Sequence, residues 1–445
     1  MKYNNVKNFF FNNICIMDYI KNFNQSDSII HYIPKNTDIL LLGESTHGTE
    51  EFYKNRSDIT KQLVSFDNFN IILFETDWFN LYNVNKYIHN KSENKSAKEA
   101  LSNIHSFPIW LWKNNIIIDL IEWLKKFNEK STKKVYLLGL DCYLLKESLD
   151  WLYAFLKIID INLYNSIYSN LKFMNKCKTT TEFINIAIKN PQIDIFIQDY
   201  FQQILIQIQN NSQKYIKKCN ELNIDTIAII SAEICCDVII NSYEYFKKQY
   251  LEPPGSNASW NTRDQHMLMT TMKLKDKISK SKIIIWAHNS HIGDATATEH
   301  GGTDFSNNNS WNLGQMCRAM FENTFIIGFG TYNGSVLAAP KWDDKHNIYV
   351  LNVPIKDSIE EHIYHFCKSR NINNCFIDLK KCKNISPFNT KKKQRMIGVI
   401  YNSNNELQSH YITSILSDHY DLYIFISHTS HLIEPSQKKS FTDSF

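Results

Sequence analysis

Ionisable side chains follow four short apolar runs of this sequence, at the point where each run ends. They are, in chain order, Glu44 and His47, Glu75 and Asp77, Asp141, and finally His288, His291 and Asp294. Groups of this kind can move protons when the fold brings them together, and strongly desolvated histidines and carboxylates often mark functional sites. The convergence of four runs on the same residue types therefore predicts a catalytic site.

Acid–base chemistry accounts for the whole set. Histidine titrates near neutral pH, so a histidine held by a carboxylate can take a proton from water and return it to a leaving alkoxide. Arg56 lies on an otherwise apolar helical stripe, and its expected partner is the carboxylate of Glu44 or Glu75. Arg56 and the N–H groups at a helix N-terminus could stabilise an oxyanion.

A metal site is the main alternative, because imidazole and carboxylate groups also bind divalent ions that activate water. The candidate ligands are Glu44, His47, Glu75, His288 and His291. They lack the tight H-E-x-x-H spacing, and we expect neither a metal nor another cofactor. Ser45 is not in a G-x-S-x-G elbow, and the sequence contains no G-x-G-x-x-G or P-loop motif for a nucleotide.

Each group also has an ordinary structural interpretation. A lone glutamate or aspartate at a strand end, such as Glu44 or Asp141, is as often a cap or an ion-pair partner. His47 sits beside Gly48 and could be a solvated loop residue. His288 and His291 are harder to explain in this way, because two histidines directly after a buried strand are costly to desolvate without a purpose.

The elements that must position these residues indicate an α/β fold with a mostly parallel sheet. Continuous apolar runs of this length are typical of strands that are buried on both faces. The runs cover residues 38–43, 69–75, 134–140, 282–288, 324–330, 395–401 and 420–427. Amphipathic helices are predicted at 49–66, with Phe52, Arg56, Ile59, Leu63 and Phe66 inward, and at 114–127, with Ile117, Leu120, Ile121 and Leu124 inward. In such a sheet, ligands bind outside the carboxyl ends of the strands.

The strand pattern is interrupted in the middle of the chain. We expect one domain over 1–445, with an α/β core at 30–145 and 255–436 and a helical subdomain at 146–254 that forms the active-site cleft. A Pro-Pro-Gly sequence ends this subdomain, and a further helix is predicted at about 261–275.

The composition excludes several classes of protein. The net charge of +4 over 445 residues leaves no basic face for nucleic acid. Ten cysteines without a C-x-x-C pair are typical of reduced thiols. Residues 1–20 do not resemble a secretory signal, and no apolar run approaches the roughly 20 residues that span a bilayer. We expect a cytoplasmic monomer that contacts no membrane.

At these same residues the sequence resembles the erythromycin esterases and their uncharacterised relatives. The stretches that carry the resemblance run in family order over residues 38–436, and the region of the predicted helical subdomain matches only loosely. They are "GESTHGTEEFYKNR", "FETDWFNLYNVNKYI", "FPIWLWKNNIIIDLIEWLKKFN", "LLGLDCYLLKESLDWL", "WNTRDQHM", "IIIWAHNSHIGDATATEHGG", "NLGQMCR", "IIGFGTYNGS", "RMIGVIYNSNNELQSHYI" and "HLIEP".

The resemblance implies hydrolysis of a cyclic ester by an activated water, without a covalent acyl-enzyme. The positions that match the family's active site are Glu44, His47, Glu75 and His288, and the expected supporting residues are Arg56, His291 and Asp294. Of the two histidines at those positions, we favour His288 as general base, because a strand end holds a ring more firmly than the glycine turn beside His47. Ser45 and Lys113 depart from the family pattern without removing an ionisable group of the site.

Three functions follow from the resemblance. The first is an esterase that opens a macrolide lactone and so confers antibiotic resistance. The second is a hydrolase with the same site that acts on another small-molecule ester. The third is a non-catalytic protein associated with polysaccharide biosynthesis, and the retained Glu, His and Arg residues argue against it.

Overall fold

The computed structural model describes residues 19–23, 26–253, 256–306 and 308–435. Most of the segment 1–20, expected to lack a secretory signal, lies outside these residues. Among the residues that are described, no helix is long and apolar enough to cross a membrane. The nine cysteines within the described part are free and buried.

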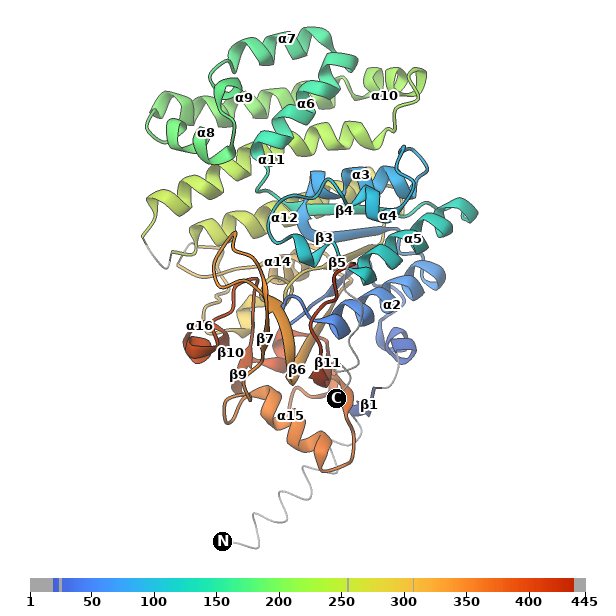
Figure 1. The fold of residues 1–445 in the computed structure, drawn as a ribbon, viewed down its shortest axis with the longest axis vertical. Helices are drawn as coiled ribbons and strands as arrows, with labels where there is room; N and C mark the ends of the chain where they lie inside the picture. The colour runs from blue at the N-terminus through green and yellow to red at the C-terminus, as the bar shows by residue number, and fades with distance from the viewer. Residues whose placement is uncertain (1–18, 24–25, 254–255, 307, 436–445) are drawn as a thin grey trace, which may run out of the picture.

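A nine-stranded sheet forms the centre of the molecule (Figure 1). Its order is β1-β8-β11-β6-β2-β5-β3-β4, and β7 pairs with the far end of β6. The pairs from β11 through to β4 are parallel, whereas β1, β7 and β8 pair in antiparallel fashion. The strands are β1 Ile20–Asn22, β2 Ile39–Leu42, β3 Ile71–Asp77, β4 Tyr136–Asp141, β5 Ile283–Trp286, β6 Thr324–Ala338, β7 Asn347–Val350, β8 Asn374–Asp378 and β11 Leu422–Thr429. The predicted α/β fold with a mostly parallel sheet is confirmed.

Helices cover both faces of this sheet, which explains why its central strands are apolar throughout. Leu40 and Leu42 pack into one core with α2, α3 and α5, whereas Ile39 and Leu41 pack into the opposite core with α12, α14 and α15. The helices outside the predicted helical subdomain are α2 Glu50–Phe66, α3 Trp78–Ile88, α4 Ala97–Ala100, α5 Asn115–Lys130, α12 Ala258–Lys277, α13 Asn289–Ile292, α14 Leu313–Met320, α15 Ile359–Lys368, α16 Glu406–Ser409 and α17 Leu416–His419.

The two predicted amphipathic helices form α2 and α5. The predicted inward residues of α5 are all fully buried, and Asn114 caps the helix by accepting a hydrogen bond from the backbone N–H of Ile117. The prediction for α2 is wrong at one position, because Phe66 is 74% exposed. Leu63 and Val64 of the last turn are buried, whereas Phe66 at the end of the helix is exposed.

The region from Leu145 to Leu251 contains the helices α6 Leu145–Ile159, α7 Ile161–Asn170, α8 Thr180–Ala187, α9 Pro191–Asn210, α10 Ser212–Glu221 and α11 Ile227–Leu251. These helices pack around an apolar core of their own. Figure 1 shows them stacked at one end of the molecule, with α11 between the others and α12.

The prediction of a strand at 395–401 is wrong. Only Arg395 belongs to a strand, β9 Lys391–Arg395, which pairs with β10 Tyr411–Ile415 in a separate two-stranded antiparallel sheet. The residues that follow form isolated bridges, Thr46 to Ile397 and Ala339 to Ile400. Burial of Met396 and Ile397 accounts for the apolar composition that suggested a central strand.

Candidate active site

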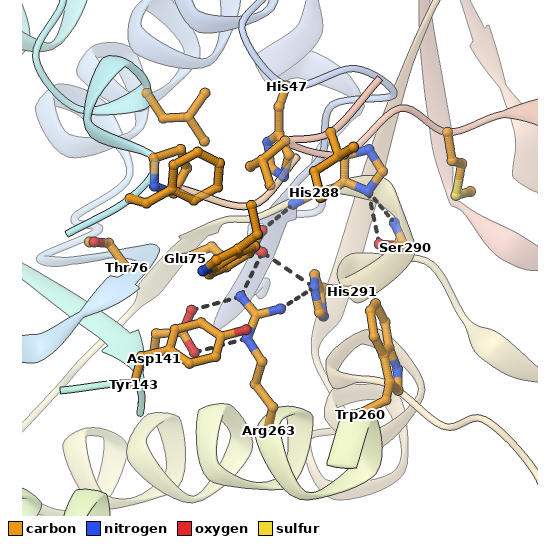
Figure 2. A pocket seen from close by; sticks show the side chains of 18 of the residues that line it. His47, Glu75, Thr76, Asp141, Tyr143, Trp260, Arg263, His288, Ser290 and His291 are labelled. Carbon is orange, nitrogen blue, oxygen red and sulfur yellow. Dashed lines mark hydrogen bonds and ion pairs between the residues drawn. The ribbon is translucent and has the colours of Figure 1, made fainter. Parts of the chain in front are cut away.

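The carboxyl ends of β2, β3, β4 and β5 face a cavity of about 450 Å³ (Figure 2). These four strands are neighbours in the order β4-β3-β5-β2, and all run in parallel. Their carboxyl ends therefore lie at one edge of the sheet, as the sequence predicted. The histidine, acidic and basic residues that line the cavity are His47, Glu75, Asp77, Asp141, Arg263, His288, His291 and His410.

His47 is held by a buried carboxylate that is itself held by an arginine. Its Nδ1 atom lies 2.9 Å from Oε1 of Glu44, and the Nη2 atom of Arg56 donates to Oε2 of Glu44 at 2.8 Å. The guanidinium of Arg56 lies over the rings of Tyr53 and Trp286, at 4.4 and 4.7 Å from their centroids. Both oxygens of Glu44 are thus engaged, which fixes the carboxylate and, through it, the imidazole ring.

The turn that carries His47 is fixed by its backbone. Gly48 has a φ of +72°, and a Cβ atom there would come within 2.3 Å of the Leu337 carbonyl oxygen. The N–H of His47 donates to the carbonyl of Ile397 at 3.0 Å, and the N–H of Ile397 donates to Ser45 at 2.8 Å. The segment around Ile397, which lies outside the central sheet, thus holds the His47 turn in place.

Glu75 contacts the backbone of His288 and the side chains of Arg263 and His291. One oxygen accepts the backbone N–H of His288 at 2.8 Å, and the other accepts Nη2 of Arg263 at 2.8 Å and lies 3.3 Å from Nε2 of His291. Burial raises the pKa of the Glu75 carboxyl, but the nearby His291 and Arg263 outweigh it and leave this pKa well below its ordinary value. Glu75 is therefore ionised at neutral pH.

Arg263 extends from α12 toward Glu75, Asp141 and His291, as Figure 2 shows. Its Nε and Nη2 atoms donate to the two oxygens of Asp141 at 2.9 and 2.7 Å. The guanidinium also lies 5.1 Å from the centroid of the Tyr143 ring. This bidentate pair neutralises Asp141 and connects it to Glu75.

His291 lies flat on Trp260, with ring centroids 4.3 Å apart and planes 9° apart. Its Nδ1 atom lies 2.7 Å from Oδ1 of the buried Asp264. Burial lowers the pKa of His291, but Asp264 and Glu75 outweigh this effect and raise it to about 9. Arg263 Nη1 lies 2.9 Å from Nε2. If the His291 ring is neutral, its Nε2 atom accepts this hydrogen bond from Arg263. Asp264 and Glu75 favour the charged ring, whose Nε2–H group donates to Glu75 instead.

His288 differs from His47 and His291, because no carboxylate side chain of the described residues is hydrogen-bonded to its ring. Its Nδ1 atom lies 2.8 Å from the hydroxyl of Ser290 and accepts the backbone N–H of the same residue at 3.3 Å. Its ring centroid is 4.7 Å from that of His47. Burial, followed by the proximity of His47, holds the pKa of His288 well below its ordinary value.

Asp77 lies beside Asp141 on the neighbouring strand. Its Oδ1 atom accepts the backbone N–H of Leu144 at 2.9 Å. Burial and, to a lesser extent, the charge of Asp141 raise the pKa of Asp77 to about 8. This carboxyl group is therefore largely protonated at neutral pH.

The remaining wall of the cavity is apolar and aromatic. It includes Phe107, Leu111, Trp112, Trp342, Met396 and Val399. None of the described residues that line this cavity lies between 146 and 254, and the expectation that the helical region forms the cleft stays a prediction. Those helices pack on one another and reach the remainder of the chain mainly through α11 and α12, so that loops near 107 and 342 and the 396–400 segment supply this wall.

Six of the predicted site residues form one arrangement in which Arg56 holds Glu44 and Glu44 holds His47, while Glu75 contacts both His288 and His291. Asp294 is the exception. Its carboxylate caps Thr296 and binds Arg318 at 3.0 Å, and it does not line the cavity. In the described part of the chain, no three His, Cys, Asp or Glu side chains form a group that could hold a metal ion.

Arg263, Asp264 and Asp77 were not among the predicted site residues. The sequence predicts Asp77 and Asp141 at strand ends but indicates no separate role for either. Arg263 and Asp264 lie in the quoted stretch "WNTRDQHM", on a helix rather than after a strand. Adjacent residues of opposite charge inside this helix, Arg263 followed by Asp264, were the available signal.

Comparison with known proteins places this geometry in a family. "Erythromycin esterase type II" of Escherichia coli is 20% identical over 355 residues, which cover 77% of this chain and 80% of that protein. A mutant of the erythromycin esterase EreC, in its open conformation, has a TM-score of 0.60 at 16% identity and covers 95% and 96% of the two chains.

Two further crystal structures share the fold. A succinoglycan biosynthesis protein has a TM-score of 0.71 at 18% identity, with 95% of this chain and 97% of that chain covered. A Bacillus cereus protein has a TM-score of 0.74 at 16% identity, with 96% and 98% covered. The family model described as Erythromycin esterase matches residues 64–429, which is most of the sequence. The chain therefore belongs to the erythromycin esterase family.

Proposed function

We propose that the protein hydrolyses an ester of a small molecule, with His47 as the base that activates the attacking water. The observation that carries this proposal is the buried chain of hydrogen bonds from Arg56 through Glu44 to His47 at the edge of the cavity. A carboxylate that holds one nitrogen of an imidazole leaves the other nitrogen free to accept a proton.

The catalytic steps follow from the tautomer of His47 that carries its proton on Nδ1. Nδ1–H of His47 donates to Glu44, so Nε2 carries the lone pair that takes a proton from water. The imidazolium that forms is stabilised by the adjacent carboxylate of Glu44. His47 then returns the proton to the alkoxide that leaves, which yields a carboxylic acid and an alcohol without an acyl-enzyme.

The hydrogen bonds support a reversal of the expected histidine roles. We favoured His288 as general base because it ends a strand. Its Nδ1 atom, however, accepts an N–H from Ser290, and burial and the proximity of His47 outweigh the charge of Glu75 and hold the pKa of the ring well below its ordinary value. His47 has such a carboxylate, and its glycine turn is held by backbone bonds on two sides.

Glu75, Arg263 and His291 have a supporting role in this proposal. Glu75 accepts the backbone N–H of His288 and so fixes the loop between β5 and α13. Arg263 and the charged His291 keep Glu75 ionised, and Asp264 keeps His291 in place. These four side chains form a rigid network beside His47, which transfers the proton.

The substrate that we propose first is a macrolide lactone, opened in a reaction that would confer antibiotic resistance. Family membership and the relatives named as erythromycin esterases support this choice, and the apolar wall of the cavity suits a large hydrophobic ester. Another hydrophobic ester is the alternative, because these relatives are only 16 to 20% identical.

The test is a hydrolysis assay over a panel of macrolide lactones and simple hydrophobic esters, with mass detection of one added water. We expect turnover of at least one panel member and a loss of roughly 10²–10⁴-fold in kcat for His47→Gln. His300→Gln, the same change at an exposed histidine, is the matched control and should be fully active. No turnover by the native protein on any panel member would refute the proposed function.

A further inference from the structure

Two segments that contribute to the apolar wall of the cavity are bound to each other, and one of them is bound to the His47 turn. They are 396–400 and the turn 341–344, which lies between β6 and β7. The first segment is hydrogen-bonded to the His47 turn through the backbone of Ile397. The carbonyl of Val399 accepts the N–H of the residue that follows β6, at 2.8 Å. This wall is therefore continuous from the proposed base to the turn 341–344.

Trp342 presents a half-exposed indole ring at the edge of the cavity. It lines the cavity, yet 50% of the residue is exposed. Its ring centroid lies 4.8 Å from that of Phe107 and 6.0 Å from that of Tyr143, and both of these side chains also line the cavity. A single exposed aromatic residue is ordinary on a protein surface, but one that extends the wall of a cavity offers a large apolar surface to a ligand.

Gly398 lacks a side chain at a position of the cavity wall where one would fit. Apart from its chain neighbours, no heavy atom of the described residues lies within 4 Å of a Cβ atom placed there, whereas a Cβ atom at any other described glycine would come within 2.9 Å of another atom. The φ of Gly398 is not positive either. Met396 lines the cavity while Ile397 packs into a separate core, so the Cβ direction at 398 follows that of Met396. The glycine therefore widens the cavity and is not required by the backbone.

We propose that Gly398 and Trp342 form a specificity subsite that binds the bulky apolar group of the ester. This inference rests on the proposed function. The occupant is part of the substrate, because both residues line the same cavity as His47. An apolar group placed against Glu75 and Arg263 would desolvate charged side chains, whereas the wall that contains Gly398 and Trp342 carries no such cost.

The subsite is tested by the ratio of kcat/KM for a bulky ester to kcat/KM for a small one. The bulky probe is the macrolide or other large panel ester that reacts fastest, and the small probe is phenyl acetate. We expect Gly398→Val to lower this ratio by roughly 10–200-fold, because its methyl groups occupy space that the bulky group needs. Gly398→Ala adds one carbon and should lower the ratio less. Trp342→Ala should lower it about tenfold, through a higher KM for the bulky ester.

Trp123→Ala is the matched control for the tryptophan. It makes the same change on α5, at a residue that does not line the cavity, and should leave the ratio at its native value. If Gly398→Val and Trp342→Ala fold and keep the native ratio, or lower kcat/KM equally for both esters, the subsite is wrong.

A binding measurement distinguishes failure of the subsite from failure of the proposed function. Calorimetry with the His47→Gln variant, which lacks the proposed base, gives the Kd of each bulky panel ester. We expect this Kd to rise about tenfold when Trp342→Ala or Gly398→Val is added. If Kd rises in this way but the native protein hydrolyses no ester, the subsite stands and the proposed hydrolysis fails. If bulky esters are hydrolysed but both added substitutions leave Kd unchanged, the hydrolysis stands and the subsite fails. If no bulky ester binds, the subsite is wrong even when phenyl acetate is hydrolysed.

Discussion

Replacing Glu44 by glutamine should inactivate the protein by a route that can be worked out from the structure. Arg56 has only N–H donors, and its Nη2 atom lies 2.8 Å from Oε2 of Glu44. A glutamine amide must therefore turn its oxygen toward Arg56. Its NH₂ group then faces Nδ1 of His47, at the position where Glu44 now accepts. His47 is forced to accept at Nδ1 and to carry its proton on Nε2, so it loses the lone pair needed to activate water.

The size of the effect follows from the comparison with serine hydrolases. There, the equivalent change from carboxylate to amide leaves the geometry intact and lowers kcat by about 10⁴-fold through the wrong tautomer. We expect a loss of roughly 10³–10⁴-fold in kcat for Glu44→Gln, with KM nearly unchanged because Glu44 does not line the cavity. Since Arg56 keeps an acceptor, the free energy of unfolding should fall by only about 1–3 kcal/mol.

The assay is steady-state hydrolysis of the best panel ester, combined with thermal unfolding of each variant. Glu221→Gln makes the same chemical change on the exposed end of α10 and serves as the control, with native activity expected. A folded Glu44→Gln variant with kcat within tenfold of the native value would refute the view that Glu44 sets the tautomer of the base.

Three further predictions concern the buried charges. The pKa of His291 is raised from 6.5 to about 9, so its charge stabilises the fold fully below about pH 6.5. That contribution, roughly 3 kcal/mol, is lost as pH rises through about 9, and the difference in unfolding free energy between native protein and His291→Gln should shrink over this interval. The pKa of Asp77 is raised from 3.8 to about 8, so ionisation of Asp77 destabilises the fold increasingly above about pH 4. Asp77→Asn should therefore melt higher than the native protein at pH 8, and an equal or lower melting temperature would contradict this. Arg263→Met leaves the buried Asp141 without its cation and Glu75 with His291 alone, and chemical denaturation should show a loss of about 3–5 kcal/mol. A loss below 1 kcal/mol would show that this network does not stabilise the floor of the site.

The sequence was sufficient to predict the edge of the sheet where the site lies. Parallel strands that run in the same direction bring their carboxyl ends to one edge, so residues such as Glu44, Glu75 and His288 converge even though they are far apart in the chain. The four strands that carry them proved to be direct neighbours. Six of the seven apolar runs without alternation are strands of this sheet, because helices cover both of its faces, and the run at 395–401 is the exception.

The contribution of Arg263 was not predictable in the same way. It lies on a helix, and its partner Asp141 is 122 residues away in the sequence. A helical pattern shows which face is apolar, but it does not show which distant carboxylate a polar residue meets. The error at 395–401 has a related cause, since burial against the His47 turn gives the same apolar composition as a central strand.

The roles of the two histidines depended on hydrogen bonds at single atoms. His47 has a carboxylate three residues earlier in the same turn, and His288 has a serine two residues later at a helix start. Both patterns are local and visible in the sequence. Only their geometry, however, shows which ring nitrogen each partner engages, and on that geometry we propose His47 rather than His288 as the base.

The most direct test of this account is a single comparison of ester hydrolysis by the native protein and by His47→Gln, with the acid product detected by mass. The account predicts that the native protein adds one water to a hydrophobic ester or lactone. It also predicts that the folded variant is slower by roughly 10²–10⁴-fold at saturating substrate. A native protein that opens no ester, or a His47→Gln variant that turns over at the native rate, would contradict it.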